Sequence, residues 1–303
     1  MHLYNRVVGI IFLSQIGVGV LGNSCFLCCY GFPLFSSHRS RPVEPIVVQL
    51  MLCNTIVLLT QGCPLALFHL DKGYFLGNAG CKMVFYLHRV TRGHSICTTC
   101  LLSAFQAITI SPSHSSFAKV KVKLPKLIKP SCLLCWIFNM IIEMSVPIHL
   151  TASRYINSSH EGELDLLYCF RERALKELTI FPSLRDMLLV GCMVFTSSYM
   201  IFSLFRHHQR VHHIHSSCLA PRTFPEVKAT QTILLLLGIF VTAYCINCLF
   251  TLYKVYVIHS GAWVVVVSTF IAMCFPTISP FLLIHRDTEP SRSCCAPWQR
   301  PSL

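Results

Sequence analysis

Cysteine is the residue type whose number and spacing first suggest chemistry in this chain. Eight of its 18 cysteines form C-x-x-C pairs, namely Cys25/Cys28, Cys97/Cys100, Cys132/Cys135 and Cys245/Cys248. Such pairs bind zinc when two of them converge as thiolates. All four pairs lie inside long apolar segments, where thiolates would be costly and where cysteine commonly behaves as a small buried hydrophobe. We therefore interpret these cysteines as packing residues and predict neither a metal site nor a cofactor.

A histidine-rich segment offers a second pattern of possible metal ligands. It consists of His207, His208, His212, His213 and His215, with Arg206 and Arg210 interleaved among them. The two arginines and the position just after an apolar segment favour a basic, solvated extension of a helix. Such an extension suits contact with anionic lipid headgroups or with a cytosolic partner better than it suits metal binding.

Ionisable residues inside the apolar segments are more informative, because each is costly in lipid and usually faces other helices. The third segment contains His88, Arg89 and Arg92. His88 and Arg92 are four residues apart and therefore share one face of a helix. We predict that these three residues, with Phe85 and Tyr253, line an outward-opening ligand pocket. In the alternative interpretation, Arg89 reaches the lipid headgroups and Arg92 ties helices together.

Few residues in the apolar segments could support catalysis or coupled transport. Glu143 is taken as the one carboxylate well within a segment, so coupled ion transport has little to work with. Neither His-Glu-x-x-His nor a pair of intramembrane carboxylates occurs, which argues against a hydrolase. The last segment has no lysine between Gly261 and Ile284, which excludes a retinal Schiff base there. We predict that the protein is not an enzyme.

The elements that must position these residues are seven long apolar segments. Of the 303 residues, 53% are hydrophobic and 12% charged, against about 25% charged in soluble proteins. A bilayer-spanning helix needs about 20 apolar residues, and its backbone must be satisfied within the segment. The sequence predicts a single all-α membrane domain with a short tail at 285–303, and spans at Val7–Phe35, Ile46–Phe68, Cys81–Ile110, Ser131–His149, Leu184–Phe205, Thr230–Tyr253 and Gly261–Ile284.

The net charge of +13 indicates orientation rather than nucleic-acid binding, because the basic residues lie mainly in connecting segments. The connections that follow the first, third, fifth and seventh segments contain more lysines and arginines than the connections on the other side of the membrane. The positive-inside rule therefore predicts an extracellular N-terminus and a cytoplasmic C-terminus. Asn157 begins the Asn-x-Ser/Thr sequon of the loop between the fourth and fifth segments, and we predict its glycosylation on the outer face.

Four cysteines outside the C-x-x-C pairs lie near the predicted membrane surfaces. Cys81 starts the third segment and Cys169 lies in the long outer loop, where an oxidising compartment favours a disulfide between them. Two free thiols are the alternative. Cys294 and Cys295 follow the last segment, a position that is typical of palmitoylation.

Several stretches in order along the chain carry a family resemblance. They are Gly22-Asn23, the run from His88 to Pro112, the run from Arg206 to Ser216, the run from Pro225 to Leu236, and the run from Phe275 to Phe281. Together they resemble the vomeronasal type-1 pheromone receptors, a family of rhodopsin-like G-protein-coupled receptors. Phe105-Gln106-Ala107 stands where most rhodopsin-like receptors have Asp-Arg-Tyr, and Ser279-Pro280 replaces the Asn-Pro of their seventh helix.

The resemblance implies a plasma-membrane receptor that binds small pheromone-type molecules and signals to an inhibitory-class heterotrimeric G protein. We expect the G protein to meet two basic loops, through Lys119, Lys121, Lys123, Arg206, Arg210 and Lys228. We also expect Pro276 and Pro280 to supply hinges in the last span. The alternative is a small transporter or channel, which would show inverted repeats or broken helices. We find no convincing internal repeat.

Overall fold

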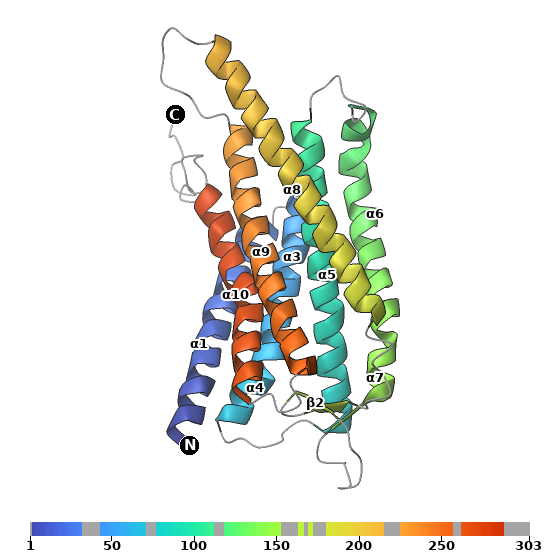
Figure 1. Cartoon of the computed structure of the whole chain (residues 1–303), viewed down its shortest axis with the longest axis vertical. Coiled ribbons are helices and arrows are strands. Elements are labelled where there is room, and N and C mark those ends of the chain that lie inside the picture. The colour runs from blue at the N-terminus through green and yellow to red at the C-terminus, as the bar shows by residue number, and fades with distance from the viewer. Residues whose placement is uncertain are drawn as a thin grey trace, which may run out of the picture.

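The computed structural model describes residues 2–31, 43–70, 77–111, 118–152, 163–166, 169–171, 180–214, 225–256 and 262–287. Its helices form one elongated bundle (Figure 1). They are α1 (His2–Phe26) with η1 (Leu27–Gly31), α3 (Glu44–Val57) with η2 (Leu58–Gly62) and α4 (Cys63–His69), α5 (Asn78–Ile110), α6 (Ala118–Ile142) with η3 (Glu143–Ser145) and α7 (Val146–His149), α8 (Ile180–Ile214), α9 (Pro225–Tyr256) and α10 (Ala262–Asp287).

Seven of these helical segments are long and apolar enough to cross a membrane, which confirms the predicted seven-helix bundle. They are Leu3–Cys29, Glu44–His69, Asn78–Ile110, Lys119–Ile148, Pro182–Arg206, Thr230–Phe250 and Trp263–His285. The first helix begins before the predicted Val7, at His2, so its first residues include the polar Asn5 and Arg6. The ends of the other helices reach beyond the lipid-sized runs, since a helix does not have to stop where its apolar stretch ends.

The fourth helix corrects one expectation. The lysines between Lys119 and Lys129 were expected in a loop, yet α6 begins at Ala118 and remains helical through Pro125 and Pro130. Each internal proline costs one backbone hydrogen bond but does not prevent the helix from continuing. The basic residues at this end therefore stand on a helix. The expected helical extension after the fifth span is confirmed as far as Ile214, where α8 ends.

The loop between the fourth and fifth spans adds a small sheet that the sequence analysis did not predict. It contains β1 (Leu150–Ala152), β2 (Glu163–Leu166) and β3 (Cys169–Arg171), in the order β1-β3-β2 with antiparallel pairing. β1 contacts α5. Figure 1 shows the sheet at the end of the bundle where α1 and α5 begin. It covers part of that end of the bundle.

α5 is the central helix of the bundle and packs against α3, α6, α8 and α9. Two-thirds of its apolar stretch, 67%, is buried, against 17% for the fourth span and 11% for the fifth. Its buried Thr98 and Thr99 hydroxyls donate to backbone carbonyls one turn back, so small polar residues fill the core without leaving unpaired donors. Because so little of the fourth and fifth spans is buried, α6 and α8 present most of their surface to lipid.

α1 and α10 are joined where a proline removes a backbone donor. Pro280 has no N–H to offer the carbonyl of Pro276, and the Asn23 Nδ2 of α1 donates to that carbonyl at 2.9 Å instead. The two helices approach closely at Gly22, where an added Cβ would lie only 2.9 Å from the Phe281 ring. Gly22 and Asn23 are therefore explained together: one permits the approach and the other satisfies the exposed carbonyl.

Replacing Asn23 by alanine should destabilise the folded bundle by about 1–3 kcal/mol, because the buried carbonyl of Pro276 loses its partner. The measurement is thermal unfolding of the purified protein in detergent. Ser14→Ala on the same helix is the control, since the exposed Ser14 hydroxyl bonds only to Ile11 of its own turn. Equal unfolding temperatures for Asn23→Ala and the unmodified protein would contradict the role given to Asn23.

Candidate functional site

The candidate site is a cluster of charged side chains in the half of the bundle that adjoins the small sheet. Glu143 lies in the turn η3 at the end of α6, and its carboxylate is almost fully buried. Arg89 of α5 donates from Nε to Glu143 Oε2 at 2.6 Å. This contact joins the third and fourth spans and gives a charged partner to a carboxylate buried in an apolar region.

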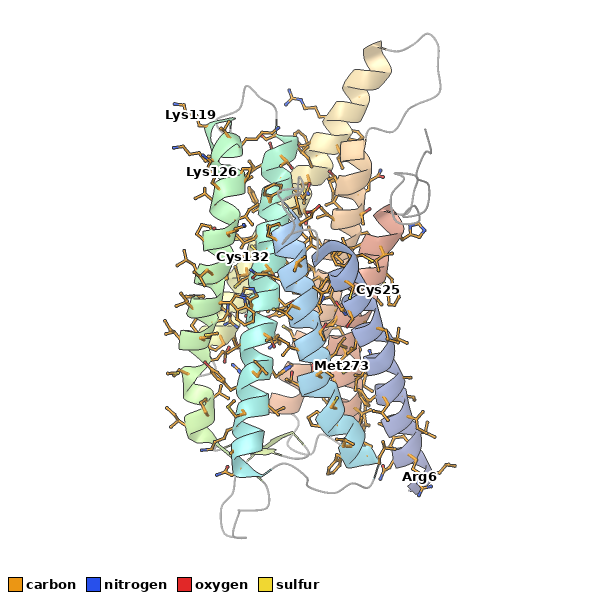
Figure 2. The ribbon with its side chains drawn as sticks, turned by 180° about the vertical axis from the view of Figure 1, so that it is seen from behind. Arg6, Cys25, Lys119, Lys126, Cys132 and Met273 are labelled. Carbon is orange, nitrogen blue, oxygen red and sulfur yellow. The ribbon has the colours of Figure 1, made fainter. Side chains whose placement is uncertain are left out.

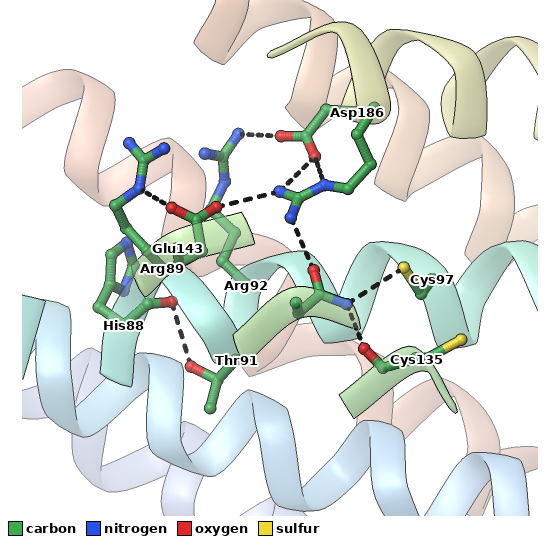
Figure 3. A network of polar contacts seen from close by, with 10 residues as sticks. His88, Arg89, Thr91, Arg92, Cys97, Cys135, Glu143 and Asp186 are labelled. Carbon is green, nitrogen blue, oxygen red and sulfur yellow. Dashed lines mark hydrogen bonds and ion pairs between the residues drawn. The ribbon is translucent and has the colours of Figure 1, made fainter. Parts of the chain in front are cut away.

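Arg185 and Asp186, at the start of α8, complete the charged cluster (Figure 3). Arg185 Nη2 lies 3.4 Å from Glu143 Oε1 and 2.8 Å from Asp186 Oδ1, and Nε also donates to Asp186. Both side chains are less than a tenth exposed. The fifth span is thus tied to the same carboxylate as the third.

Asn139 and Gly93 determine how closely the helices approach around Arg185. Arg185 Nη1 donates to Asn139 Oδ1 at 2.7 Å, and Asn139 Nδ2 donates to the Cys135 carbonyl and to Cys97 Sγ. A Cβ at Gly93 would overlap Asn139 Oδ1 and lie 2.9 Å from Arg185 Nη1. Only glycine leaves room there for the guanidinium and the amide, so Gly93 belongs to the site although it has no side chain.

Arg92 extends the cluster to a fourth helix. Its Nη2 lies 3.6 Å from Asp186 Oδ2, and its Cζ lies 5.7 Å from the centre of the Tyr244 ring on α9, within the range of a cation–π contact. Its side chain is 38% exposed, more than those of Arg89 and Arg185. His88, one turn away on the same face, has a buried Nδ1 without a hydrogen-bond partner among the described residues.

The structure brings some predicted ligand residues together and separates others. His88, Arg89 and Arg92 lie in or beside the cluster, with Thr91 donating to the His88 carbonyl. Phe85 is half-buried one turn before Arg89 on α5. Tyr253, 43% exposed on α9, packs near Trp263 instead of joining the cluster. The contacts of Arg92 agree with the alternative that it ties helices together, whereas Arg89 pairs with Glu143 instead of reaching the headgroups. Ligand contact by any of the five residues stays a prediction.

Sequence reasoning missed Arg185, Asp186 and Asn139. Glu143 was singled out as the one carboxylate well within a segment, whereas Asp186 and its neighbour Arg185 are 3% and 8% exposed near the start of the fifth span. The available signal was the pair of adjacent opposite charges at the start of an apolar segment. Charges in such a position usually pair with charged residues of a neighbouring helix.

The remaining predicted sites lie away from this cluster. Lys119, Lys121 and Lys123 are exposed, and Lys121 Nζ donates to the Thr109 carbonyl at the end of α5. Figure 2 shows Lys119 and Lys126 at the end of the bundle opposite Arg6. Arg206 is exposed on α8, while Arg210 and Lys228 are placed on α8 and α9 by their backbone alone. Asn157, Cys294 and Cys295 lie outside the described residues.

Cys81 is fully buried at the start of α5 and is disulfide-bonded. Cys169 begins β3, and only its backbone is described. Among the described residues no group of three or more His, Cys, Asp or Glu side chains could hold a metal ion.

Comparison with known proteins identifies the class of receptor. The model of the "Vomeronasal organ pheromone receptor family" matches residues 6–296. Human vomeronasal type-1 receptor 4 is 41% identical over 300 residues, covering 97% of this chain and 98% of that receptor. Human vomeronasal type-1 receptor 1 is 38% identical over 299 residues, covering 97% and 84% respectively. The chain belongs to the vomeronasal type-1 receptor family.

Membership of this family establishes a chemosensory receptor and a multi-pass protein of the plasma membrane. The likeness extends to fish, because the zebrafish olfactory receptor class A-like protein 1 is 30% identical over 302 residues, covering 98% of this chain and 94% of that protein. The vomeronasal resemblance seen in the sequence is therefore confirmed over nearly the whole chain.

Replacing Glu143 by leucine should destabilise the receptor by about 3–5 kcal/mol, because Arg89 and Arg185 lose a buried partner. Thermal unfolding and the amount of receptor at the cell surface measure the effect. Adding Arg89→Leu to Glu143→Leu should recover part of the loss, since the double variant leaves one fewer unpaired charge. Glu44→Gln at the start of α3 serves as the control for removing a carboxylate. Unchanged stability of Glu143→Leu would mean that the cluster does not hold the three helices together.

Proposed function

We propose that this receptor binds small, mostly apolar pheromone-type molecules within its helix bundle and signals to a heterotrimeric G protein without catalysing a reaction. The observation that carries the proposal is the charged cluster, which joins α5, α6, α8 and α9. A cavity between helices with a few oriented polar groups suits such ligands. Within the cluster, Arg92 is partly exposed and His88 has a ring nitrogen without a partner among the described residues, so both have hydrogen-bonding capacity to offer.

The proposed orientation places the N-terminus and the small sheet outside the cell. The exposed lysines at the start of α6 stand at the opposite end of the bundle from Arg6, as the positive-inside rule requires for a cytoplasmic face. We assign Cys169 as the disulfide partner of Cys81, which is supported by the contact of β1 with α5 and by the pairing of β1 with β3. This disulfide would pin the outer loop across the mouth of the bundle.

Signalling would follow from a ligand that binds one bundle conformation more tightly than another. Arg92 contacts both Asp186 of α8 and Tyr244 of α9. A ligand that engages Arg92 would therefore alter the contact between α5 and α9 directly. At the inner end of α5, Gln106 receives a contact from Thr109 of its own helix. That neutral contact stands where most rhodopsin-like receptors use the charged Asp-Arg-Tyr sequence.

The G protein would dock on the exposed basic residues of α6 and α8. Lys119 and Lys123 lie on one end of α6, and Arg206 is the last residue of the apolar span of α8. The family resemblance implies an inhibitory-class G protein, which lowers cellular cAMP.

The receptor is expressed with an inhibitory-class G protein and screened with urinary volatiles and steroids. An active compound should lower cellular cAMP. His88→Ala and Arg92→Ala should change the potency of that compound while leaving surface expression intact, with about 0.5–1.5 kcal/mol lost for each hydrogen bond removed. Tyr4→Ala, an exposed position on α1, is the matched control. Unchanged potency in both variants would remove these residues from the pocket, and ion flux without G-protein coupling would overturn the receptor mechanism.

The double variant Lys119→Gln/Lys123→Gln should require about two- to thirtyfold more G protein for half-maximal activation, because each of the two exposed ion pairs contributes about 0.2–1 kcal/mol. Nucleotide exchange on purified G protein measures the effect. Arg6→Gln removes one positive charge at the opposite end and should leave the G-protein requirement unchanged. A larger effect from Arg6→Gln than from the double variant would reverse the assigned orientation.

A further inference from the structure

A cavity of about 760 Å³ lies between α5, α6 and α8, beside the charged cluster but outside the set of predicted ligand residues. Cys97, Cys100 and Leu101 of α5 line it, together with Cys135 of α6 and Leu189 of α8. None of the five predicted ligand residues belongs to its lining. The cavity is therefore a separate feature from the pocket proposed for the pheromone-type ligand.

The cavity opens toward lipid. Phe138 and Ile142 of α6 and Leu184 and Leu188 of α8 also line it. Phe138, Leu184 and Leu188 are 51%, 55% and 63% exposed. These residues lie within spans that are mostly exposed in the bundle, so their surroundings are acyl chains and not water. A molecule dissolved in the bilayer can enter here without crossing the aqueous mouth of the receptor.

Among the described residues, one charged side chain lines the cavity, and most of the hydrogen-bond donors of that side chain already have partners. Arg185 is the charged residue among the described lining side chains. A guanidinium has five N–H donors. Nε and Nη2 of Arg185 serve Asp186 and Glu143, and Nη1 donates to Asn139, so the second N–H of Nη1 is left to offer a ligand. Because the other N–H groups of Arg185 are already donated, one donor remains, which matches a single hydroxyl better than a headgroup with several charged oxygens.

We propose that this cavity is a lipid-facing site for one neutral sterol, whose apolar body lies along α5, α6 and α8 and whose single hydroxyl accepts a hydrogen bond from Arg185. The volume falls in the range of about 300–1,000 Å³ that holds one small molecule. Apolar side chains and thiols match a fused hydrocarbon body, and thiols behave as apolar groups in such surroundings. A phospholipid, with two chains and a headgroup that carries several acceptors, matches neither the size of the cavity nor the single donor that Arg185 has left.

The test uses the full-length receptor in phosphatidylcholine nanodiscs, a photoreactive cholesterol analogue and mass spectrometry of the labelled peptides. Labelling should saturate, should concentrate on the segments 97–101, 135–142 and 184–189, and should be displaced by unlabelled cholesterol. Cys100→Phe fills the inner wall and should reduce labelling at least fivefold. Met187→Phe is the matched control, because Met187 is 66% exposed on α8 and does not line the cavity.

Unfolding temperatures establish that each variant is folded, and Leu189→Phe provides a second way to fill the cavity if Cys100→Phe does not fold. Labelling that rises without saturation, or that spreads evenly over lipid-facing residues such as Leu21 and Leu134, would overturn the proposal. Equal displacement by an anionic phospholipid would also overturn it, because the site would then select for charge. None of these measurements depends on G-protein signalling, so the result stands apart from the proposed function.

Discussion

Charged side chains in the apolar part of a helix bundle need partners of opposite charge. That requirement organises the half of this receptor that adjoins the small sheet. In the proposed orientation this is the outer half. The Glu143 carboxylate forms ion pairs with Arg89 and Arg185. The Asp186 carboxylate forms an ion pair with Arg185 and a longer one with Arg92. Since each buried charge without a partner would be strongly unfavourable, the positions of α5, α6 and α8 are linked to one another. The absence of a side chain at Gly93 follows from the same requirement, because Arg185 needs space beside its acceptors.

In the other half, the inner half of the proposed orientation, the side-chain contacts between spans that the described residues make are mostly neutral. Asn54 donates to Ser279 and receives a contact from Ser95, which joins α3, α5 and α10. Thr196 donates to Ser103, which joins α5 to α8. A neutral hydrogen bond contributes about 0.5–1.5 kcal/mol, whereas removing one partner of a buried ion pair costs about 3–5 kcal/mol. The bundle can therefore rearrange at its inner end more easily than at its charged outer end.

The sequence predicted the spans and the family but not the partners of its charges. The spans follow from local composition, since the bilayer sets the length of an apolar run and backbone pairing requires a helix. Arg89 and Arg92 could be picked out because charges in such a run are rare. Their acceptors could not, because which residues face each other depends on the rotation of α6 and α8 about their axes. The small sheet was missed because short strands carry weak local signals. The helical lysines of α6 were missed because Pro125 and Pro130 locally argue against a helix.

The asymmetry between the two halves suggests how a ligand at the outer end could influence the inner end. Arg92 is the most exposed of the three arginines in the cluster, and it contacts α9 through Tyr244. Arg89 lies 2.6 Å from Glu143 and Arg185 lies 2.8 Å from Asp186, so a ligand competing for either arginine would have to replace a short ion pair. Arg92 lies farther from its carboxylate, at 3.6 Å, and can exchange partners at lower cost. A shift of Arg92 changes the α5–α9 contact while the remaining ion pairs keep α5, α6 and α8 in place, so movement would be directed to α9 and to the neutral contacts of the inner half.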